Sequence, residues 1–248
     1  MKWHIGCSGF MYRGWKEVFY PVEYPQRRYF EYYASQFDTL ELNVTFYKFP
    51  QLAALKKWYD VSPNHFLFSL KAPRLITHYK QMKDCERELN DFYTTVEEGL
   101  KEKLGCILFQ FPPKFIFTED RLELIIKNLK PGIKNVVEMR DKSWWNKKTI
   151  KTLSENNIIF SGISHPILPE TQEVVVNNKS VYYRFHGIPK LFYSEYDEDG
   201  LKKIADAILR KKKNTEDVFI YFNNTASLAA INNARFIRDY VSEVGKII

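Results

Sequence analysis

Polar side chains that can bind anions or transfer protons recur at the ends of short apolar runs in this chain. Glu41 and Asn43 end one such run, and Glu138 and Arg140 end another, and the two members of each pair are two positions apart. Residues two apart on a β-strand point to the same face. The same pattern supplies Lys71, Gln110, Arg184, His186, Asn223 and Asn224. Burying so many polar groups is costly unless they pair or bind a ligand, so the set predicts a ligand site.

The cationic members of this set indicate an anionic ligand. Arginine forks suit carboxylate or phosphate groups, and a lysine adds a point charge. We therefore expect Lys71, Arg140 and Arg184 to bind a small anion. The alternative is that Glu41 and Glu138 neutralise the two arginines internally, and the sequence leaves both interpretations open.

Three residues are candidates for acid/base catalysis, namely Glu41, Glu138 and His186, because carboxylates and imidazole can exchange protons at suitable pKa values. The amides of Asn43, Gln110 and Asn223 are expected to orient the ligand. A metal held by Glu41, Glu138 and His186 is a weaker alternative, since nearby cations oppose it and no His-x-His or His-Glu-x-x-His motif occurs. We expect no metal. A Schiff base at Lys71 is another alternative.

Strands and helices alternate along the chain. The strands are predicted at 3–7, 39–47, 66–71, 106–111, 136–140, 158–163, 181–186 and 218–223. The helices are predicted at 27–37, 51–61, 86–104, 118–129, 143–156, 201–212 and 228–241, with Thr118 and Ser143 as N-caps. The segment that contains Pro166 and Pro169 lacks a helical pattern.

Eight strands alternating with helices in 248 residues predict the α/β class and a (β/α)8 TIM-type barrel, with residues 1–248 forming a single domain. A doubly wound sheet is the alternative, but the first strand is not followed by Gly-x-Gly-x-x-Gly. Catalytic residues of such barrels lie at the carboxyl ends of the strands, where the polar residues of this chain fall.

The run 39–47 alternates strictly between apolar and polar residues. Leu40, Leu42, Val44 and Phe46 fall on one side, and Glu41, Asn43, Thr45 and Tyr47 fall on the other. The polar side could be a solvated face of an antiparallel sheet. The other interpretation is a strand buried on both faces, with its polar side directed into a cavity. The similar endings of the other strands favour the cavity.

Composition restricts the class of protein. The formal net charge is +7, 45% of the residues are hydrophobic, and no apolar run is long enough to span a bilayer. The first twenty residues lack the pattern of a secretory signal, and the three cysteines lack metal-ligand spacing. We therefore expect a cytoplasmic protein that does not enter the membrane. The basic run 210–213 follows a predicted helix and is expected to face water.

Aromatic residues near the predicted strand ends keep a second class of partner open. They are Phe10, Tyr12, Trp15, Tyr47, Trp144 and Tyr193. Such rings can stack on sugars or nucleobases, but they can equally pack loops together. Nucleic-acid binding is therefore possible, although no recognised motif supports it.

The same residues carry a resemblance to a known family. The segments are Gly6-Cys7-Ser8-Gly9, Phe37 to Tyr47, Lys71-Ala72-Pro73 with Thr77-His78, Leu108 to Pro113, Val137 to Arg140 with Ser143-Trp144, Tyr183 to Gly187, and Tyr221 to Asn224. In this order they resemble the YecE-like family, the family of domain of unknown function 72. The resemblance implies a TIM-barrel-like fold and no established activity. The family often has an Asp near the end of the sixth strand, where this chain has Ser164 and His165.

These observations predict an intracellular barrel enzyme that acts on a small phosphorylated or carboxylated substrate by acid/base chemistry at the carboxyl ends of the strands. The alternatives are a nucleic-acid-binding or processing protein and a non-catalytic small-ligand sensor. The sequence names no cofactor, reaction or oligomeric state.

Overall fold

The computed structural model describes residues 1–168, 174–177 and 179–245. The chain forms two compact units. Unit 1 comprises Met1–Leu40 and Gly162–Ile248, and unit 2 comprises Glu41–Ser161. Pro169, in the segment predicted to lack a helix, lies outside the described residues.

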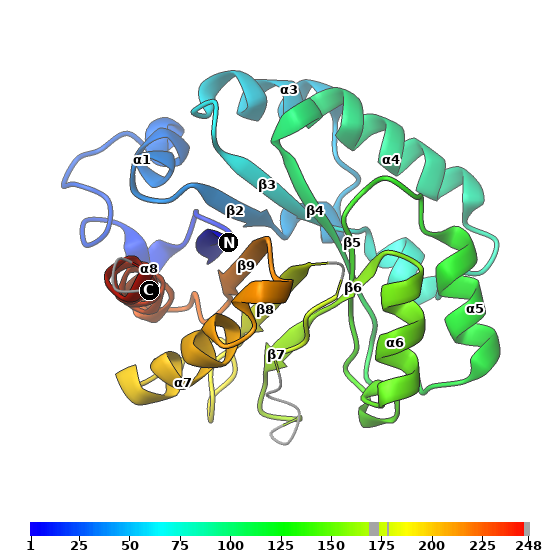
Figure 1. The fold of residues 1–248 in the computed structure, drawn as a ribbon. Coiled ribbons are helices and arrows are strands. Elements are labelled where there is room, and N and C mark those ends of the chain that lie inside the picture. The colour runs from blue at the N-terminus through cyan, green and yellow to red at the C-terminus, as the bar shows by residue number, and fades with distance from the viewer. Residues whose placement is uncertain (169–173, 178, 246–248) are drawn as a thin grey trace. The chain divides into compact units, whose positions relative to one another are not determined.

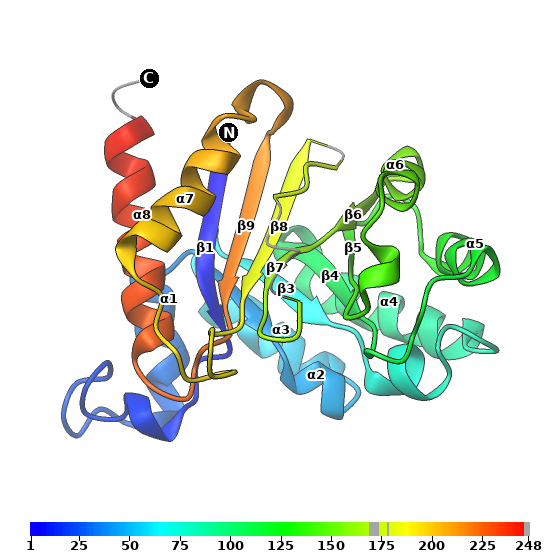
Figure 2. The same cartoon turned by 90° about the horizontal axis from the view of Figure 1, so that it is seen from below.

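Unit 1 contains four parallel strands in the order β1 (Lys2–Ser8), β9 (Asp217–Phe222), β8 (Ser180–Phe185) and β7 (Gly162–Ser164). Helix α8 (Ala229–Gly245) packs on β1, β9 and α7 (Glu198–Leu209). Figure 2 shows α7 and α8 on the same side of these strands. Helix α1 (Tyr29–Gln36) precedes β2 (Thr39–Leu42). Every residue of β8 is buried, as expected for a parallel strand covered on both faces.

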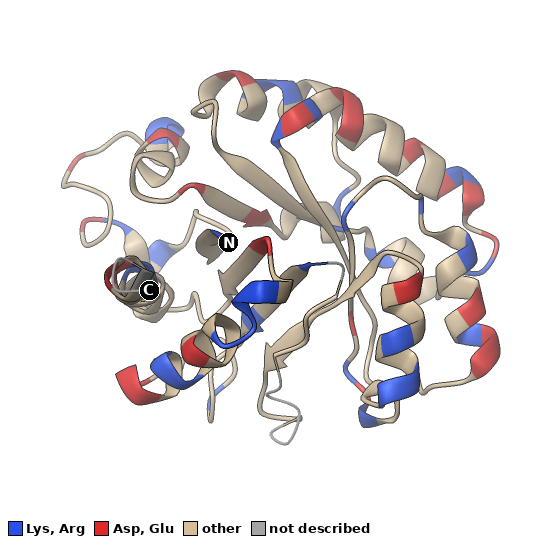
Figure 3. Cartoon of the chain, viewed as in Figure 1, with Lys and Arg blue, Asp and Glu red and all other residues tan. Residues whose placement is uncertain are grey.

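Unit 2 contains the parallel strands β3 (Leu67–Lys71), β4 (Leu104–Gln110), β5 (Asn135–Glu138) and β6 (Ile158–Phe160), paired in that order. Its main helices are α3 (Leu52–Val61), α4 (Glu86–Leu100), α5 (Glu119–Asn128) and α6 (Lys147–Glu155), which Figure 1 shows alongside these strands. Helix α3 packs on α4, and α6 packs on β6. Charged residues concentrate on the helices, whereas the strands are largely uncharged (Figure 3).

Local signals explain where two of these helices begin. The hydroxyl of Thr118 accepts a hydrogen bond from the backbone N–H of Arg121, so the predicted N-cap of α5 is confirmed. The predicted start of α6 is wrong. Ser143 lies in a short 3-10 turn, Lys142–Trp144, and the side chain of Asn146 caps α6 through Thr149 N.

The strand predicted over 39–47 is half as long in the structure. β2 ends at Leu42, and α2 (Val44–Tyr47) follows. Asn43 has helical backbone angles, with φ −88° and ψ −13°, and therefore ends the extended conformation. The Thr45 hydroxyl lies 2.9 Å from Leu42 O and 2.6 Å from Lys71 O, which holds the turn against β3. All four residues of β2 are buried, so the solvated-face interpretation is wrong.

The strand predicted over 158–163 is divided at Ser161. β6 pairs with β5, whereas β7 pairs with β8, so the chain changes its hydrogen-bonding partner at this residue. The other predicted strands agree with the structure within two residues at each end.

The predicted exposure of the basic run 210–213 is confirmed. Across the described ranges, none of the helices combines the length and apolar character needed to cross a membrane.

Candidate functional site

The ends of β3, β4 and β5 bring three of the predicted site residues together in unit 2. Lys71 ends β3, Gln110 ends β4 and Glu138 ends β5, and Gln110 and Glu138 are register partners. The Lys71 ammonium donates to Gln110 Oε1 at 2.8 Å. Gln110 Nε2 donates to Phe111 O at 2.6 Å, which fixes the amide with its oxygen toward the lysine.

Arg140 follows β5 and pairs with the last residue of that strand. Its Nε donates to Glu138 Oε1 at 2.5 Å, and the two side chains are 12% and 0% exposed. One half of the internal-neutralisation alternative is therefore realised, because Glu138 does pair with Arg140. A buried ion pair of this kind is strongly destabilised when one partner is removed.

Glu41 and Asn43 come from β2 and the turn that follows it. The Glu41 side chain is fully buried within β2. Asn43 precedes α2 and does not continue the strand, so the predicted same-face alternation of the two residues is wrong. Asn43 Oδ1 is buried, and the described residues offer it no hydrogen-bond donor. That oxygen is an acceptor positioned for a ligand or a solvent molecule.

His78 is a functional candidate that the sequence analysis did not select. It lies on the π-helical turn Leu75–Tyr79 that follows β3, and its Nδ1 is 2.9 Å from Thr77 Oγ1. The pKa of His78 is lowered from 6.5 to about 4, first by burial and then by the positive charges of Lys71 and Arg140. His78 is therefore neutral near pH 7, in a region of positive potential. Its only signal in the sequence was its place in the Lys71–His78 family segment.

A second group of predicted residues lies in unit 1, at the ends of β8 and β9. Arg184 is 1% exposed and His186 is fully buried. Arg184 Nη1 lies 3.5 Å from His186 Nε2, and Asn223 Nδ2 lies 3.0 Å from His186 Nδ1. The guanidinium nitrogen and the Asn223 amide nitrogen are both donors, and a neutral imidazole has one acceptor nitrogen, so only one of these two contacts can be a hydrogen bond to neutral His186. The Asn223 contact, at 3.0 Å, is the shorter, which favours Nδ1 as the acceptor and Nε2 as the protonated nitrogen.

Ser164 and His165, where the family often has an Asp, both pack beside this group. The rings of His165 and His186 are 5.1 Å apart, edge to face. Ser164 Oγ accepts a hydrogen bond of 2.8 Å from Tyr196 OH. Asn224, in contrast, donates to Ser194 O and Asn233 Oδ1 and joins loops to α8.

The six aromatic candidates divide into packed and exposed rings. Trp15 and Trp144 are fully buried. Phe10 packs on Phe30, and Tyr12 donates to the Ser8 carbonyl. For these four the loop-packing interpretation holds. Tyr47 and Tyr193 are 69% and 53% exposed.

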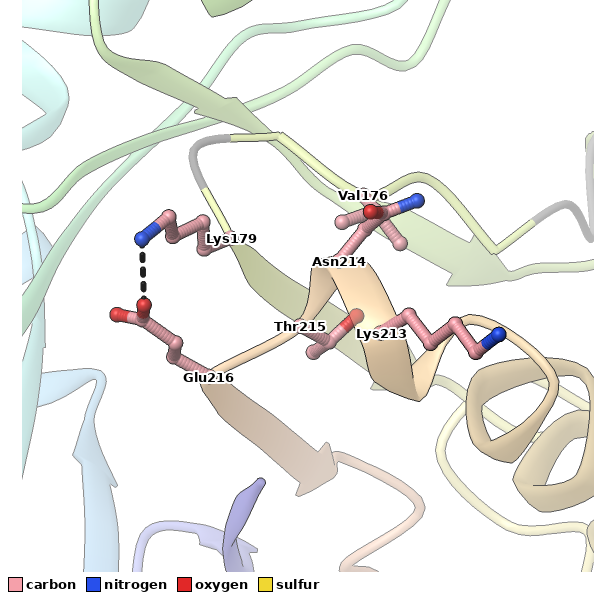
Figure 4. Close-up of a pocket in the computed structure, with 6 residues that line it drawn as sticks. All are labelled: Val176, Lys179, Lys213, Asn214, Thr215 and Glu216. Carbon is pink, nitrogen blue, oxygen red and sulfur yellow. Dashed lines mark hydrogen bonds and ion pairs between the residues drawn. The ribbon is translucent and has the colours of Figure 1, made fainter.

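A pocket of about 340 Å³ lies at the opposite, amino-terminal ends of β8 and β9, and none of the predicted site residues lines it. Figure 4 shows Lys179 paired with Glu216 at its edge, at 2.6 Å, while Lys213 extends away from that pair. Among residues 1–168, 174–177 and 179–245, no group of three or more His, Cys, Asp and Glu side chains is arranged to hold a metal ion.

Similar proteins agree with the fold and the predicted family. The UPF0759 protein YunF of Bacillus subtilis is 24% identical over 263 residues, covering 94% of this chain and 92% of YunF. The UPF0759 protein YecE of Escherichia coli is 28% identical over 85 residues, which is 34% of this chain. A crystal structure of a DUF72 family protein from Thermotoga maritima has a TM-score of 0.82 at 25% identity, covering 97% of this chain and 99% of that protein.

D-Psicose 3-epimerase from Clostridium cellulolyticum has a TM-score of 0.59 at 12% identity, over 98% of this chain and 97% of that enzyme, which shows the fold alone. The predicted TIM-type α/β barrel fold is confirmed by these matches. The model of the protein of unknown function DUF72 matches residues 4–247, and the chain belongs to this family.

Proposed function

We propose that this protein is an enzyme that acts on a small anionic substrate, phosphorylated or carboxylated, by acid/base chemistry. One observation carries the proposal, namely the gathering of Lys71, Arg140 and His78 at the ends of β3 to β5 in unit 2. Both cations lower the pKa of His78, so this region is positive in potential although Glu138 accepts a hydrogen bond from Arg140. An anion would be attracted to that potential, and Lys71 and Arg140 would supply the charge that binds it.

The neighbouring polar groups have distinct proposed roles. Gln110 holds the Lys71 ammonium in place, and the buried acceptor Asn43 Oδ1 would take a hydrogen bond from a substrate hydroxyl or amine. His78 is neutral near pH 7, so it would form hydrogen bonds with the substrate without adding charge. Glu41 and Glu138 remain the proposed proton-transfer carboxylates of this unit.

In unit 1 we propose that His186 exchanges a proton at Nε2. Arg184 lies next to that nitrogen, and Asn223 fixes the ring from the other side. The Asn223 contact at Nδ1 leaves Nε2 as the nitrogen that would exchange the proton.

Ligand-induced thermal stabilisation tests the anion site. We expect phosphorylated or carboxylated metabolites to raise the melting temperature of the wild-type protein, since a ligand that binds the native state stabilises it by mass action. Lys71→Met should abolish that increase, because it removes the charge and keeps an unbranched side chain of similar length. The matched control is Lys57→Met, which removes an exposed lysine of α3. Indifference of the wild-type protein to every anion tested would refute the proposal.

Turnover is a separate question from binding. Each stabilising ligand should be incubated with the protein and followed by NMR for chemical conversion. Conversion that is lost in Glu138→Gln or His186→Gln, in variants that circular dichroism shows to be folded, supports the enzyme. Binding without conversion over the whole set would instead identify a small-ligand sensor, and salt-sensitive binding of oligonucleotides alone would identify a nucleic-acid-binding protein.

A further inference from the structure

Two exposed tyrosines and an arginine form a continuous surface in unit 2. The Arg74 guanidinium lies 5.9 Å from the ring centroid of Tyr47 and 5.5 Å from that of Tyr79. Tyr47 is 69% exposed and Tyr79 is 66% exposed, so solvent reaches most of each residue. We call Tyr47, Arg74 and Tyr79 the ring surface.

The chain builds this surface from two unusual turns. Tyr47 ends α2, the short helix that interrupts the predicted strand. Tyr79 ends the π-helical turn Leu75–Tyr79, a conformation that occurs frequently at functional sites. That turn leaves His78 half-buried and the adjacent Tyr79 exposed. The next residues, Gln81, Met82 and Asp84, have positive φ angles of 50°, 67° and 46°, which are costly for side chains other than glycine.

Phe46 joins the ring surface to the proposed anion site. Its ring centroid is 5.0 Å from that of Tyr47 and 4.9 Å from that of His78. The Lys71 ammonium lies 3.9 Å from the same Phe46 centroid. Through Phe46, these contacts join Tyr47, Lys71 and His78 into one cluster, so the exposed ring and the cation belong to the same part of unit 2.

We propose that the ring surface stacks against a flat ring of the substrate while Lys71 and Arg140 hold its phosphate or carboxylate, so that the substrate class is a ring-bearing anion such as a nucleoside monophosphate. This inference rests on the proposed anion site. Aromatic side chains stack on bases with little sequence preference, and arginine guanidinium groups stack on the same flat faces. A nucleoside monophosphate carries both groups, joined through one pentose.

The charge around the ring surface favours this ligand over an apolar protein partner. The Arg74 guanidinium lies within 5.9 Å of both ring centroids, and the exposed Lys48 follows Tyr47 directly. An apolar docking surface would have to desolvate these cations without compensation. A ligand that carries both an anionic group and a flat ring would pair with these cations and stack on the tyrosine rings at the same time.

Affinity measurements by calorimetry test the inference with five probes, namely inorganic phosphate, ribose 5-phosphate, adenosine, adenosine 5′-monophosphate and uridine 5′-monophosphate. We expect both nucleotides to bind more tightly than ribose 5-phosphate. Tyr47→Leu and Tyr79→Leu should each weaken nucleotide binding at least about fivefold, the lower limit for loss of one ring–base stack. Binding of inorganic phosphate should not change.

The matched control is Tyr193→Leu, which removes another exposed tyrosine that lies under a cation, with Lys190 Nζ 4.3 Å from its ring centroid. It should leave every affinity unchanged. Two results would contradict the role of the ring surface and leave the anion site intact. One is equal affinity for ribose 5-phosphate and the nucleotides, and the other is a nucleotide affinity that neither tyrosine substitution changes. Adenosine binding that depends on Tyr47, with no binding of phosphate, would support the ring surface and overturn the anion site. No binding of any probe would overturn both.

Discussion

Arg140 Nε donates to Glu138 Oε1 at 2.5 Å, and this bond places a guanidinium against a carboxylate that has no solvent exposure. The pair joins the end of β5 to the loop that follows it. It thereby fixes one of the two cations of the proposed anion site.

Removing the arginine of this pair should destabilise the protein strongly. Arg140→Met leaves the Glu138 carboxylate buried without that partner, a change that costs about 3–5 kcal/mol in other buried pairs. Lys148→Met, which breaks the exposed Lys148–Glu119 pair, should cost less than about 1 kcal/mol. Urea denaturation measures both values, and similar costs would contradict a structural role for the buried pair.

The Thr45 hydroxyl should be required for the turn after β2. Thr45→Val keeps the shape of the side chain but removes the group that lies 2.6 Å from Lys71 O and 2.9 Å from Leu42 O. We expect a loss of about 1–3 kcal/mol in the free energy of unfolding, because the carbonyl that accepts the hydroxyl proton loses its donor. Thr45→Ser keeps the hydroxyl and should retain most of the stability. Equal stability of the valine variant and the wild type would show that the turn does not depend on this bond.

His78 should make stability depend on pH in the acidic range. Its pKa is lowered from 6.5 to about 4 in the folded protein, so between these values the unfolded chain binds a proton that the folded chain does not. The free energy of unfolding should therefore fall as pH decreases from about 6.5 to about 4, and this contribution should level off below that range.

To isolate this contribution, the pH dependence of the free energy of unfolding is compared between His78→Gln and the wild type. The control is His65→Gln, which removes an exposed histidine. Carboxylates titrate in the same range, but they are common to all three proteins and cancel in the differences. The pH dependence should become shallower in His78→Gln only. Parallel curves for all three proteins would exclude a lowered pKa at His78.

A bound anion should raise the pKa of His78 from about 4, because it offsets the positive charges of Lys71 and Arg140. NMR titration of the His78 imidazole, with and without a ligand that stabilises the protein, measures this change. Lys71→Met should raise the pKa without any ligand, whereas Lys57→Met should not. A His78 pKa that does not change with a bound anion would place that anion elsewhere.

The whole chain should unfold in one transition, as the predicted single domain requires. The division between the units falls inside β2, after Leu40, and again between β6 and β7, which are consecutive in the chain, after Ser161. Neither crossing has the composition of a linker. Calorimetry should give a van't Hoff enthalpy equal to the calorimetric enthalpy. Two resolved transitions would contradict the single-domain prediction.

The sequence by itself determined the alternation of strands and helices, because apolar periodicity and capping residues are local properties of the chain. It also located Lys71, Gln110 and Glu138 at strand ends, since a strand's end is marked by where its apolar run stops. The family resemblance then indicated the barrel fold that the structural comparison confirms. The predicted start of α6 and the continuity of the predicted strand 158–163 were wrong, because competing caps and a change of strand partner are not marked in the periodicity.

Only the tertiary structure decided which of these groups meet. The alternation in 39–47 is equally compatible with a longer strand, and the contact of Thr45 with Lys71 O, 26 residues away, ends β2 at Leu42. Beyond its place in a family segment, His78 carries no distinguishing mark in the sequence, and its lowered pKa depends on burial and on the charges of Lys71 and Arg140. Electrostatic potential and burial are sums over residues distant in the chain, so no local pattern contains them.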